Sequence, residues 1–162
     1  MKATQHIPDK IFSIEEISRQ TLRWKLKSKS IVFTNGVFDL LHEGHIASLT
    51  QAASLGDILI VAINSDDSVK KLKGPSRPIN NEYTRALLLA QMLIVDAIVI
   101  FNDDTPLEII KSIMPDTLVK GGDYTIDQIA GAKEVIANGG KVVLADMIDG
   151  VSTSNIIEKM KS

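Results

Sequence analysis

The stretch SIVFTNGVFDLLHEGHIASL, residues 30–49, joins a predicted strand to a predicted helix. Its first six residues are apolar and β-branched, as in a buried strand. From residue 45 to 56, apolar residues recur at helical spacing, and the final glycine, Gly56, is expected to cap the helix. His42 and His45 lie where this helix should begin. The junction therefore starts a strand–helix unit and marks a candidate site.

Strand-like and helix-like segments alternate along the chain on both sides of this junction. The other predicted strands are 57–64, 96–101, 116–123 and 141–145, and the other predicted helices are 13–27, about 65–72, 81–93, 105–114, 127–140 and 152–161. The strands are almost continuously apolar, which is typical of strands covered by helices on both faces. We therefore expect an α/β fold, a Rossmann-like, doubly wound parallel sheet of about five strands with right-handed crossovers.

Polar residues indicate where several of these helices begin. Ser13 opens the capping-box pattern SIEE. Thr105 is expected to cap the helix whose first position is Pro106, and Asn80 or Asn81 to cap the helix at 81–93.

The composition limits the class of protein. The 162 residues are 44% hydrophobic, with 18 basic and 20 acidic side chains and a net charge of −2. We expect one domain, 1–162, with an N-terminal helix and a core from residue 30. The charge balance argues against binding nucleic acid or a membrane surface. The absence of cysteine excludes disulfides and thiolate metal sites, and no signal-peptide or spanning apolar run is present, so we expect a cytoplasmic protein.

Polar residues gather after four of the predicted strands. Ligands of doubly wound sheets bind beyond the carboxyl ends of the strands, at the point where the strand order reverses. The segments concerned are Asn35–His45, Asn64–Lys73, Lys120–Asp123 and Asp149–Ser154. The sequence therefore predicts one ligand site at this edge of the sheet.

The two histidines suit an anion better than a metal. Both can point into the space in front of a helix start, where free backbone amides and the helix dipole already favour negative charge. Gly44 between them lets a ligand approach the backbone. Their spacing is i, i+3 rather than the i, i+4 of a helical zinc pair, and no third ligand is evident, so we predict no metal site. The alternative is that both are surface or capping histidines.

Two other groups of donors could contact phosphate. Lys70, Lys71 and Lys73 lie after the second predicted strand, in front of a loop whose glycine and prolines suggest a segment that closes over a ligand. A charge run of this kind is as often only a solvated face. Three hydroxyls, those of Ser152, Thr153 and Ser154, open the last helix; one is an ordinary N-cap, and together they form a second phosphate seat.

These motifs resemble a known superfamily. FTNGVFDLLHEGHIASL (33–49) is similar to the H-x-G-H signature of the nucleotidylyltransferases, and DGVSTSNII (149–157) is similar to their late segment before the final helix. Class I aminoacyl-tRNA synthetases carry a related histidine motif. The chain is too short for that class, and its KSKS lies upstream of the histidines.

Over residues 10–160, the chain resembles one particular group of enzymes within this superfamily. VAINSDDSVKKLKGPSRPINNEYTR, PDTLVKGGDY and IAGAKEVIANGGKVVL resemble the adenylyltransferases of D-glycero-β-D-manno-heptose 1-phosphate, which occur fused behind a sugar kinase or alone. Many members have cysteine where Val37 stands, a thiol that phosphoryl chemistry does not need. The resemblance implies that ATP, carrying Mg²⁺, and heptose 1-phosphate give ADP-heptose, a lipopolysaccharide precursor, and pyrophosphate. It also implies a homo-oligomer, a dimer or larger, and here we expect the stand-alone form.

The resemblance also implies roles for individual residues. The implied catalytic residues are His42, His45 and Lys73. Both histidines are also expected to bind the nucleotide, together with Thr34, Asn35, Gly36, Val37, Phe38, Lys120, Gly121, Asp123, Ser152, Thr153 and Ser154. The expected sugar-phosphate contacts are Asn35, Asp39, Asn64, Lys73, Arg77, Arg85 and Lys120. For Asp39 we weigh bracing of the turn more heavily than contact with substrate.

Two other functions remain open from the residues alone. A cytidylyltransferase acting on glycerol 3-phosphate or another small phosphate would use the same phosphate-binding residues. A non-catalytic module that senses ATP would need the binding site without the chemistry.

Overall fold

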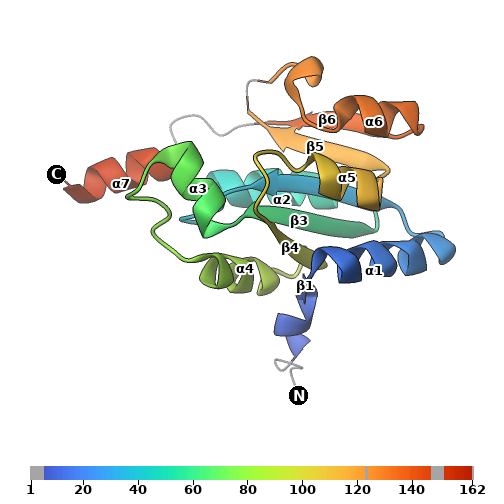
Figure 1. Cartoon of the computed structure of the whole chain (residues 1–162), viewed down its shortest axis with the longest axis horizontal. Coiled ribbons are helices and arrows are strands. Elements are labelled where there is room, and N and C mark those ends of the chain that lie inside the picture. The colour runs from blue at the N-terminus through green and yellow to red at the C-terminus, as the bar shows by residue number, and fades with distance from the viewer. Residues whose placement is uncertain (1–5, 123, 147–151, 162) are drawn as a thin grey trace.

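The structure, a computed structural model, describes residues 6–122, 124–146 and 152–161, which form one parallel sheet with helices on both faces (Figure 1). Six strands pair in the order β1-β4-β3-β2-β5-β6. Their bounds are β1 Ile11–Phe12, β2 Ile31–Gly36, β3 Ile58–Asn64, β4 Ala97–Phe101, β5 Thr117–Gly121 and β6 Lys141–Ala145. The predicted parallel α/β fold is confirmed.

The strand order reverses between β2 and β5. From β2 the chain adds β3 and then β4 on one side, and it later returns to place β5 and β6 on the other. β2 pairs with β3 along its whole length, from Ile31 opposite Ile58 to Gly36 opposite Ile63. It also pairs with β5 through residues 32–34. The carboxyl ends of β2 and β5 therefore diverge at the point where doubly wound sheets bind ligands.

Alternate residues of each strand enter two separate cores. The helices are α1 Ile14–Leu26, α2 Glu43–Ala53, α3 Asp66–Lys73, α4 Glu82–Ala90, α5 Leu107–Ile113, α6 Ala132–Ala137 and α7 Thr153–Lys161, with 3₁₀ turns η2 Pro8–Lys10 and η3 Ile126–Gln128. Phe33 of β2 packs in the core formed with α1, α5 and α6, whereas its neighbour Val32 packs in the core formed with α2 and α4. Burying such a side chain stabilises the fold by about 1.5–3 kcal/mol. None of the described helices is long and apolar enough to cross a membrane.

Several predicted boundaries are confirmed. The Ser13 hydroxyl accepts from the Glu16 amide at 3.2 Å, and the Glu16 carboxylate accepts from the Ser13 amide at 2.8 Å, which completes the capping box of α1. Asn81, not Asn80, caps α4. The sixth strand, β1, was not predicted, because two residues are too few to show a periodic pattern.

Three predicted helix details are wrong. α2 occupies 43–53 rather than 45–56 and ends before Gly56, where a Cβ would lie 2.6 Å from a methyl group of Val32; close packing, not capping, requires this glycine. α5 begins one residue after Pro106, and Thr105 does not cap it. The helix predicted at 127–140 is divided, because Gly131 takes a φ of +83° between η3 and α6.

Two glycines in left-handed conformation allow a matched test of this packing. Gly131 (φ +83°) would place a Cβ 2.7 Å from Ile110, whereas Gly139 (φ +84°) has no atom within 4 Å of that position. We expect Gly139→Ala to lower the free energy of unfolding by about 1–2 kcal/mol from backbone strain alone. Gly131→Ala should cost about 1–3 kcal/mol more, because Ile110 must move. Urea denaturation would measure both, and equal losses would contradict this account.

Candidate active site

His42 and His45 form a stacked pair at the start of α2. His42 is the N-cap residue, in an extended conformation, and His45 lies in the first turn. Their ring centroids are 3.8 Å apart, with 25° between the ring planes. The Nδ1 atoms of both rings are buried, and neither makes a hydrogen bond to a described residue. Both rings line one cavity.

Phe38 holds the turn in front of this pair. It takes a φ of +50°, a left-handed conformation that is strained for a bulky residue. Its buried ring lies 5.1 Å from the His45 ring, centroid to centroid. A Cβ on Gly36 would come within 2.9 Å of the same ring. The glycine and the strained phenylalanine together let the turn fold under the histidines.

A cavity of about 350 Å³, here called the histidine cavity, gathers most of the predicted site residues. Its walls include Thr34, Asn35, Gly36, Val37, Phe38, Asp39, His42, Gly44, His45, Lys73, Arg77, Lys120, Gly121, Ser152, Thr153 and Ser154. The start of α7 is joined to the turn by the Thr153 hydroxyl, which donates to the Leu40 carbonyl at 3.3 Å. The histidine motif and the start of the last helix thus line the same cavity.

Three further wall residues were not predicted. Ser48, Tyr124 and Asp146 also line the histidine cavity. Ser48 lies three residues after His45 on the same helix, so helical spacing could have found it. Tyr124 and Asp146 each lie just beyond the carboxyl end of a strand, β5 and β6.

A second cavity of about 380 Å³ adjoins the first, and we call it the β4 cavity because the end of β4 forms part of its wall. The two cavities share Asn35, Gly36, Val37, Lys73, Lys120 and Tyr124. Asn64, predicted to contact a sugar phosphate, lines the β4 cavity only. Lys70 and Lys71 are exposed and line neither cavity, and Asp123 lies outside the described residues.

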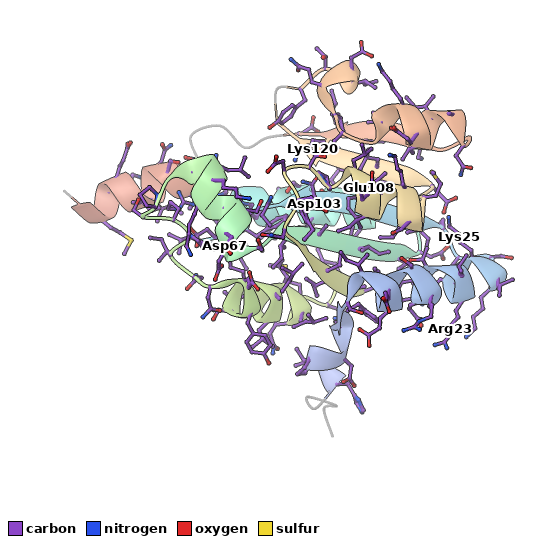
Figure 2. All side chains as sticks on the ribbon, in the orientation of Figure 1. Arg23, Lys25, Asp67, Asp103, Glu108 and Lys120 are labelled. Carbon is purple, nitrogen blue, oxygen red and sulfur yellow. The ribbon has the colours of Figure 1, made fainter. Side chains whose placement is uncertain are left out.

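Lys120 lies on the boundary between the two cavities, at the carboxyl end of β5 (Figure 2). Its Nζ is 3.4 Å from both the backbone and the side-chain oxygen of Asn35, across the switch point. It is also 5.5 Å from the centroid of the Tyr124 ring. Burial lowers the pKa of Lys120. An anion beside this ammonium group would therefore relieve an existing desolvation penalty.

The pKa values of both histidines are lowered, which favours their neutral forms. Burial, together with the neighbouring His42 ring, lowers the pKa of His45 from 6.5 to about 4. Burial also lowers the pKa of His42, against the opposing effect of Glu43. Neutral imidazoles still carry one N–H donor each, so the pair can donate hydrogen bonds to an anion without the cost of two adjacent charges.

Asp39 braces the loop that follows α3. Its buried carboxylate accepts from the backbone amides of Ile79 and Asn80, each at 2.9 Å, and from Arg77 Nε at 2.7 Å. Burial alone would raise the pKa of Asp39, but these two amides and the guanidinium group outweigh it and lower the pKa. Its oxygens are occupied by the loop at 77–80, so Asp39 braces this loop rather than the turn for which we predicted a bracing role.

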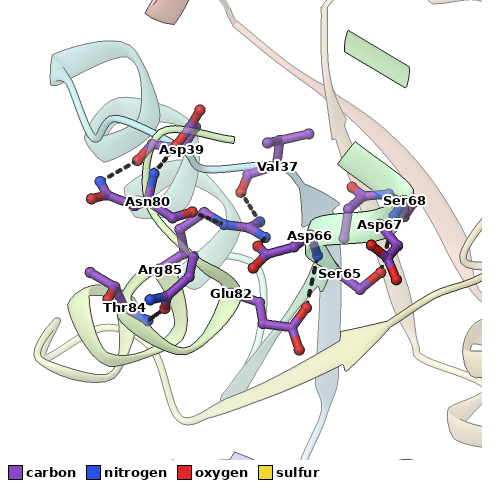
Figure 3. A network of polar contacts seen from close by, with 12 residues as sticks. Val37, Asp39, Ser65, Asp66, Asp67, Ser68, Asn80, Glu82, Thr84 and Arg85 are labelled. Atoms are coloured by element: carbon purple, nitrogen blue, oxygen red, sulfur yellow. Dashed lines mark hydrogen bonds and ion pairs between the residues drawn. The ribbon is translucent and has the colours of Figure 1, made fainter. Parts of the chain in front are cut away.

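Arg85 is the centre of a buried network (Figure 3). Its side chain is 0% exposed and donates to the Val37 carbonyl at 2.8 Å, the Asn80 carbonyl at 3.0 Å and the Asp66 carboxylate at 2.8 Å. The Glu82 carboxylate in turn accepts from the Asp66 amide at 2.7 Å. Arg85 lines neither cavity, so the prediction that it contacts a sugar phosphate is wrong. It instead ties three loops together beneath the site.

Within the described ranges, no group of three or more histidine, aspartate or glutamate side chains is placed to hold a metal ion. The cavities offer imidazole, ammonium and hydroxyl donors, together with the carboxylates of Asp146 in the histidine cavity and Asp104 in the β4 cavity. Donors converging on one space suit a polyanion, and phosphate groups in particular.

Comparison with known proteins agrees with this geometry. Residues 33–159 match the sequence profile of a family described as cytidylyltransferase-like. The chain belongs to this family. The bifunctional protein HldE of Haemophilus influenzae is 54% identical over 151 residues, 93% of this chain and 32% of its own length. HldE of Paramagnetospirillum magneticum is 50% identical over 151 residues, 93% of this chain and 31% of its own. This cytidylyltransferase-like chain thus spans about a third of the curated relatives it matches.

Two solved structures share the cytidylyltransferase-like fold. A lipopolysaccharide core biosynthesis protein from Thermoplasma volcanium superposes with a TM-score of 0.62 at 28% identity, over 75% of this chain and 99% of that one. Pantoate-beta-alanine ligase from Francisella tularensis superposes with a TM-score of 0.59 at 15% identity, over 93% and 76% of the two chains. At 15% identity, the similarity to the ligase shows only that the two proteins share a fold.

The low pKa of His45 predicts how stability depends on pH. Between about 6.5 and about 4, the unfolded chain binds a proton that the folded imidazole does not, so the free energy of unfolding should fall as the pH falls through this window. His45→Gln removes this contribution and should give a shallower fall. Urea denaturation of both proteins from pH 7.5 to 4.5 would measure the difference, and parallel profiles would contradict the assignment.

The buried position of Arg85 predicts a structural cost for even a conservative change. Arg85→Lys keeps the charge, but an ammonium group cannot reach three acceptors in the directions that the guanidinium fork serves. We expect a loss of about 3–5 kcal/mol in the free energy of unfolding, as for a broken buried ion pair. The exposed Arg23→Lys on α1 is the matched control and should change stability by less than about 0.5 kcal/mol. A similar small effect at Arg85 would refute its role.

Proposed function

We propose that the protein transfers AMP from ATP to D-glycero-β-D-manno-heptose 1-phosphate, giving ADP-heptose and pyrophosphate. The observation that carries the proposal is the single cavity in which His42, His45 and the hydroxyls at the start of α7 meet. Two helix starts and two neutral imidazoles facing one space form a seat for a triphosphate. Family membership and about 50% identity to the HldE proteins over most of the chain support the choice of reaction.

The chemical step is a direct transfer between phosphates. An oxygen of the sugar phosphate attacks the α-phosphorus of ATP, a new P–O bond forms, and the bond to the bridging oxygen breaks as pyrophosphate leaves with the electron pair. The attacking oxygen is already ionised at neutral pH, so the step needs no strong base. Catalysis then rests on position and on stabilising the negative charge of the transferred group and the leaving group.

The proposed roles follow the placement of the donors. His42, His45 and the hydroxyls of Ser152–Ser154 would hold the β- and γ-phosphates. Lys73 and Lys120, which line both cavities, would contact the α-phosphate and the phosphate of the acceptor. Mg²⁺ would arrive with ATP as part of the substrate and offset charge on the triphosphate. Gly121, whose missing side chain leaves open space, would lie against the nucleoside.

The family description favours one alternative, a cytidylyltransferase for glycerol 3-phosphate or a similar alcohol phosphate. The two activities are separated by following pyrophosphate release with ATP or CTP and a panel that contains heptose 1-phosphate, other sugar 1-phosphates and glycerol 3-phosphate. We expect release with ATP and heptose 1-phosphate. Release only with CTP would support the alternative, and binding of ATP without any release would support a sensor.

We also propose that the protein works in the cytoplasm as a homo-oligomer, a dimer or larger. The proposal follows the family resemblance, and the exposed Leu26 (87%) on α1 and Leu93 (95%) after α4 are positions at which such a contact could be tested. Light scattering coupled to gel filtration would measure the assembly, and a monomer at micromolar concentration would refute it.

The histidine pair predicts the effect of one substitution on turnover. His45→Ala should lower kcat about 100-fold or more, the scale of losing one donor to the transition state. His6→Ala is the matched control, because His6 is exposed beside Asp9 and lines neither cavity. Pyrophosphate release with ATP and heptose 1-phosphate would measure both. A near-normal rate for His45→Ala would contradict the role proposed for it.

A further inference from the structure

The β4 cavity is a second binding space that continues the histidine cavity. It lies beyond the carboxyl ends of β2, β3 and β4, and its walls also come from α3, the loop after β4 and the region of η3. Its volume of about 380 Å³ is within the range of small-molecule sites. A ligand that filled both cavities would contact the residues that both share, among them Lys73 and Lys120.

The chemistry of the β4 cavity changes from one end to the other. At the shared end are two ammonium groups, which suit phosphate. Away from it, the wall carries Asp104, Thr105 and Gln128, a carboxylate, a hydroxyl and a carboxamide. Asp104 and Thr105 belong to the loop after β4, the loop that also carries Asp103 (Figure 2).

These three side chains have hydrogen-bonding capacity to spare. All three residues are exposed, and neither Asp104 nor Thr105 makes a side-chain hydrogen bond to a described residue. The Gln128 carboxamide oxygen accepts from the Thr125 amide at 3.0 Å, while its nitrogen donates to no described residue. A carboxylate accepts from hydroxyls, and a hydroxyl and an amide nitrogen donate to them. The set therefore matches a ligand with several hydroxyl groups.

Apolar surface completes the wall. Phe101 and Leu72 also line the β4 cavity and could face the C–H groups of a sugar ring. A three-carbon acceptor such as glycerol 3-phosphate has too few groups to use the phosphate end and the polar far wall together. A sugar phosphate has both a phosphate and a ring of hydroxyls.

We propose that the β4 cavity binds the sugar of the acceptor and that Asp104, Thr105 and Gln128 select a polyhydroxylated sugar phosphate over a short alcohol phosphate. The inference rests on the proposed function and adds to it the residues that contact and select the acceptor sugar. It also gives the step a direction, because the acceptor phosphate enters from the β4 cavity while pyrophosphate leaves into the histidine cavity. Entry and departure on opposite sides are what in-line transfer requires.

Two near-isosteric substitutions test the inference. Thr105→Val and Gln128→Leu remove hydrogen-bonding groups from exposed positions on different elements. Each should raise the KM for heptose 1-phosphate about fivefold, the scale of one neutral hydrogen bond, while the KM for ATP stays within about twofold. Ser154→Ala, which changes the histidine cavity alone, is the reciprocal control and should raise the KM for ATP but not for the sugar phosphate. Thermal unfolding would verify that each variant is folded.

Calorimetric titration with heptose 1-phosphate alone separates this inference from the proposed function. If the wild type turns over but both variants keep the wild-type KM for the sugar phosphate, or lose ATP affinity equally, the inference is overturned and the function stands. If the wild type shows no turnover yet binds the sugar phosphate, and both variants bind it more weakly, the inference stands and the proposed reaction fails. Absence of both turnover and binding in the wild type overturns both.

Discussion

The parallel pairing of β2 with β5 is the constraint on which the site depends. It places the two strands side by side through residues 32–34 while the chain turns to opposite faces and opposite edges of the sheet. Beyond this pairing the strand ends separate, and Lys120 reaches back across the gap to Asn35. Both cavities open over that gap. A shift in this register by one residue would turn Lys120 to the other face and divide the site.

Buried charged side chains fix the positions of the loops around the site, which the strand pairing of the sheet does not fix. Asp39 secures the segment after α3, and Arg85 joins that segment to the turn before the histidines and to the start of α3. A buried ion pair adds little stability compared with apolar side chains, but it is costly to break, so it fixes geometry. The donors of the site belong to these loops or lie beside them. Their positions therefore depend in part on these paired charges.

The sequence predicted a residue's role well where that role depends on a short local segment. It predicted less well where the role depends on contacts with residues distant in the sequence. The histidine motif and the hydroxyls before α7 identify the site because each is a short segment at a helix start. Arg85 was misassigned, since a basic side chain near a phosphate motif gives no sign of being buried. The polar segment after β4 was overlooked, although the rule applied to the ends of the other strands would have included Asp104 and Thr105. The break at Gly131 depends on contact with Ile110, which no local pattern reveals.

The anchoring of residues 77–80 to Asp39 limits how the protein can close around its substrates. A loop rich in glycine and proline suggests a freely moving flap, yet three of its donors are fixed to one buried carboxylate. Gly74, with a φ of +95°, lies between α3 and that anchor, and its backbone is hydrogen-bonded to Lys70 on one side and to Arg77 on the other. Closure over a substrate is therefore easier for the last turn of α3, which carries Lys73, than for residues 77–80, which would first have to leave the Asp39 carboxylate.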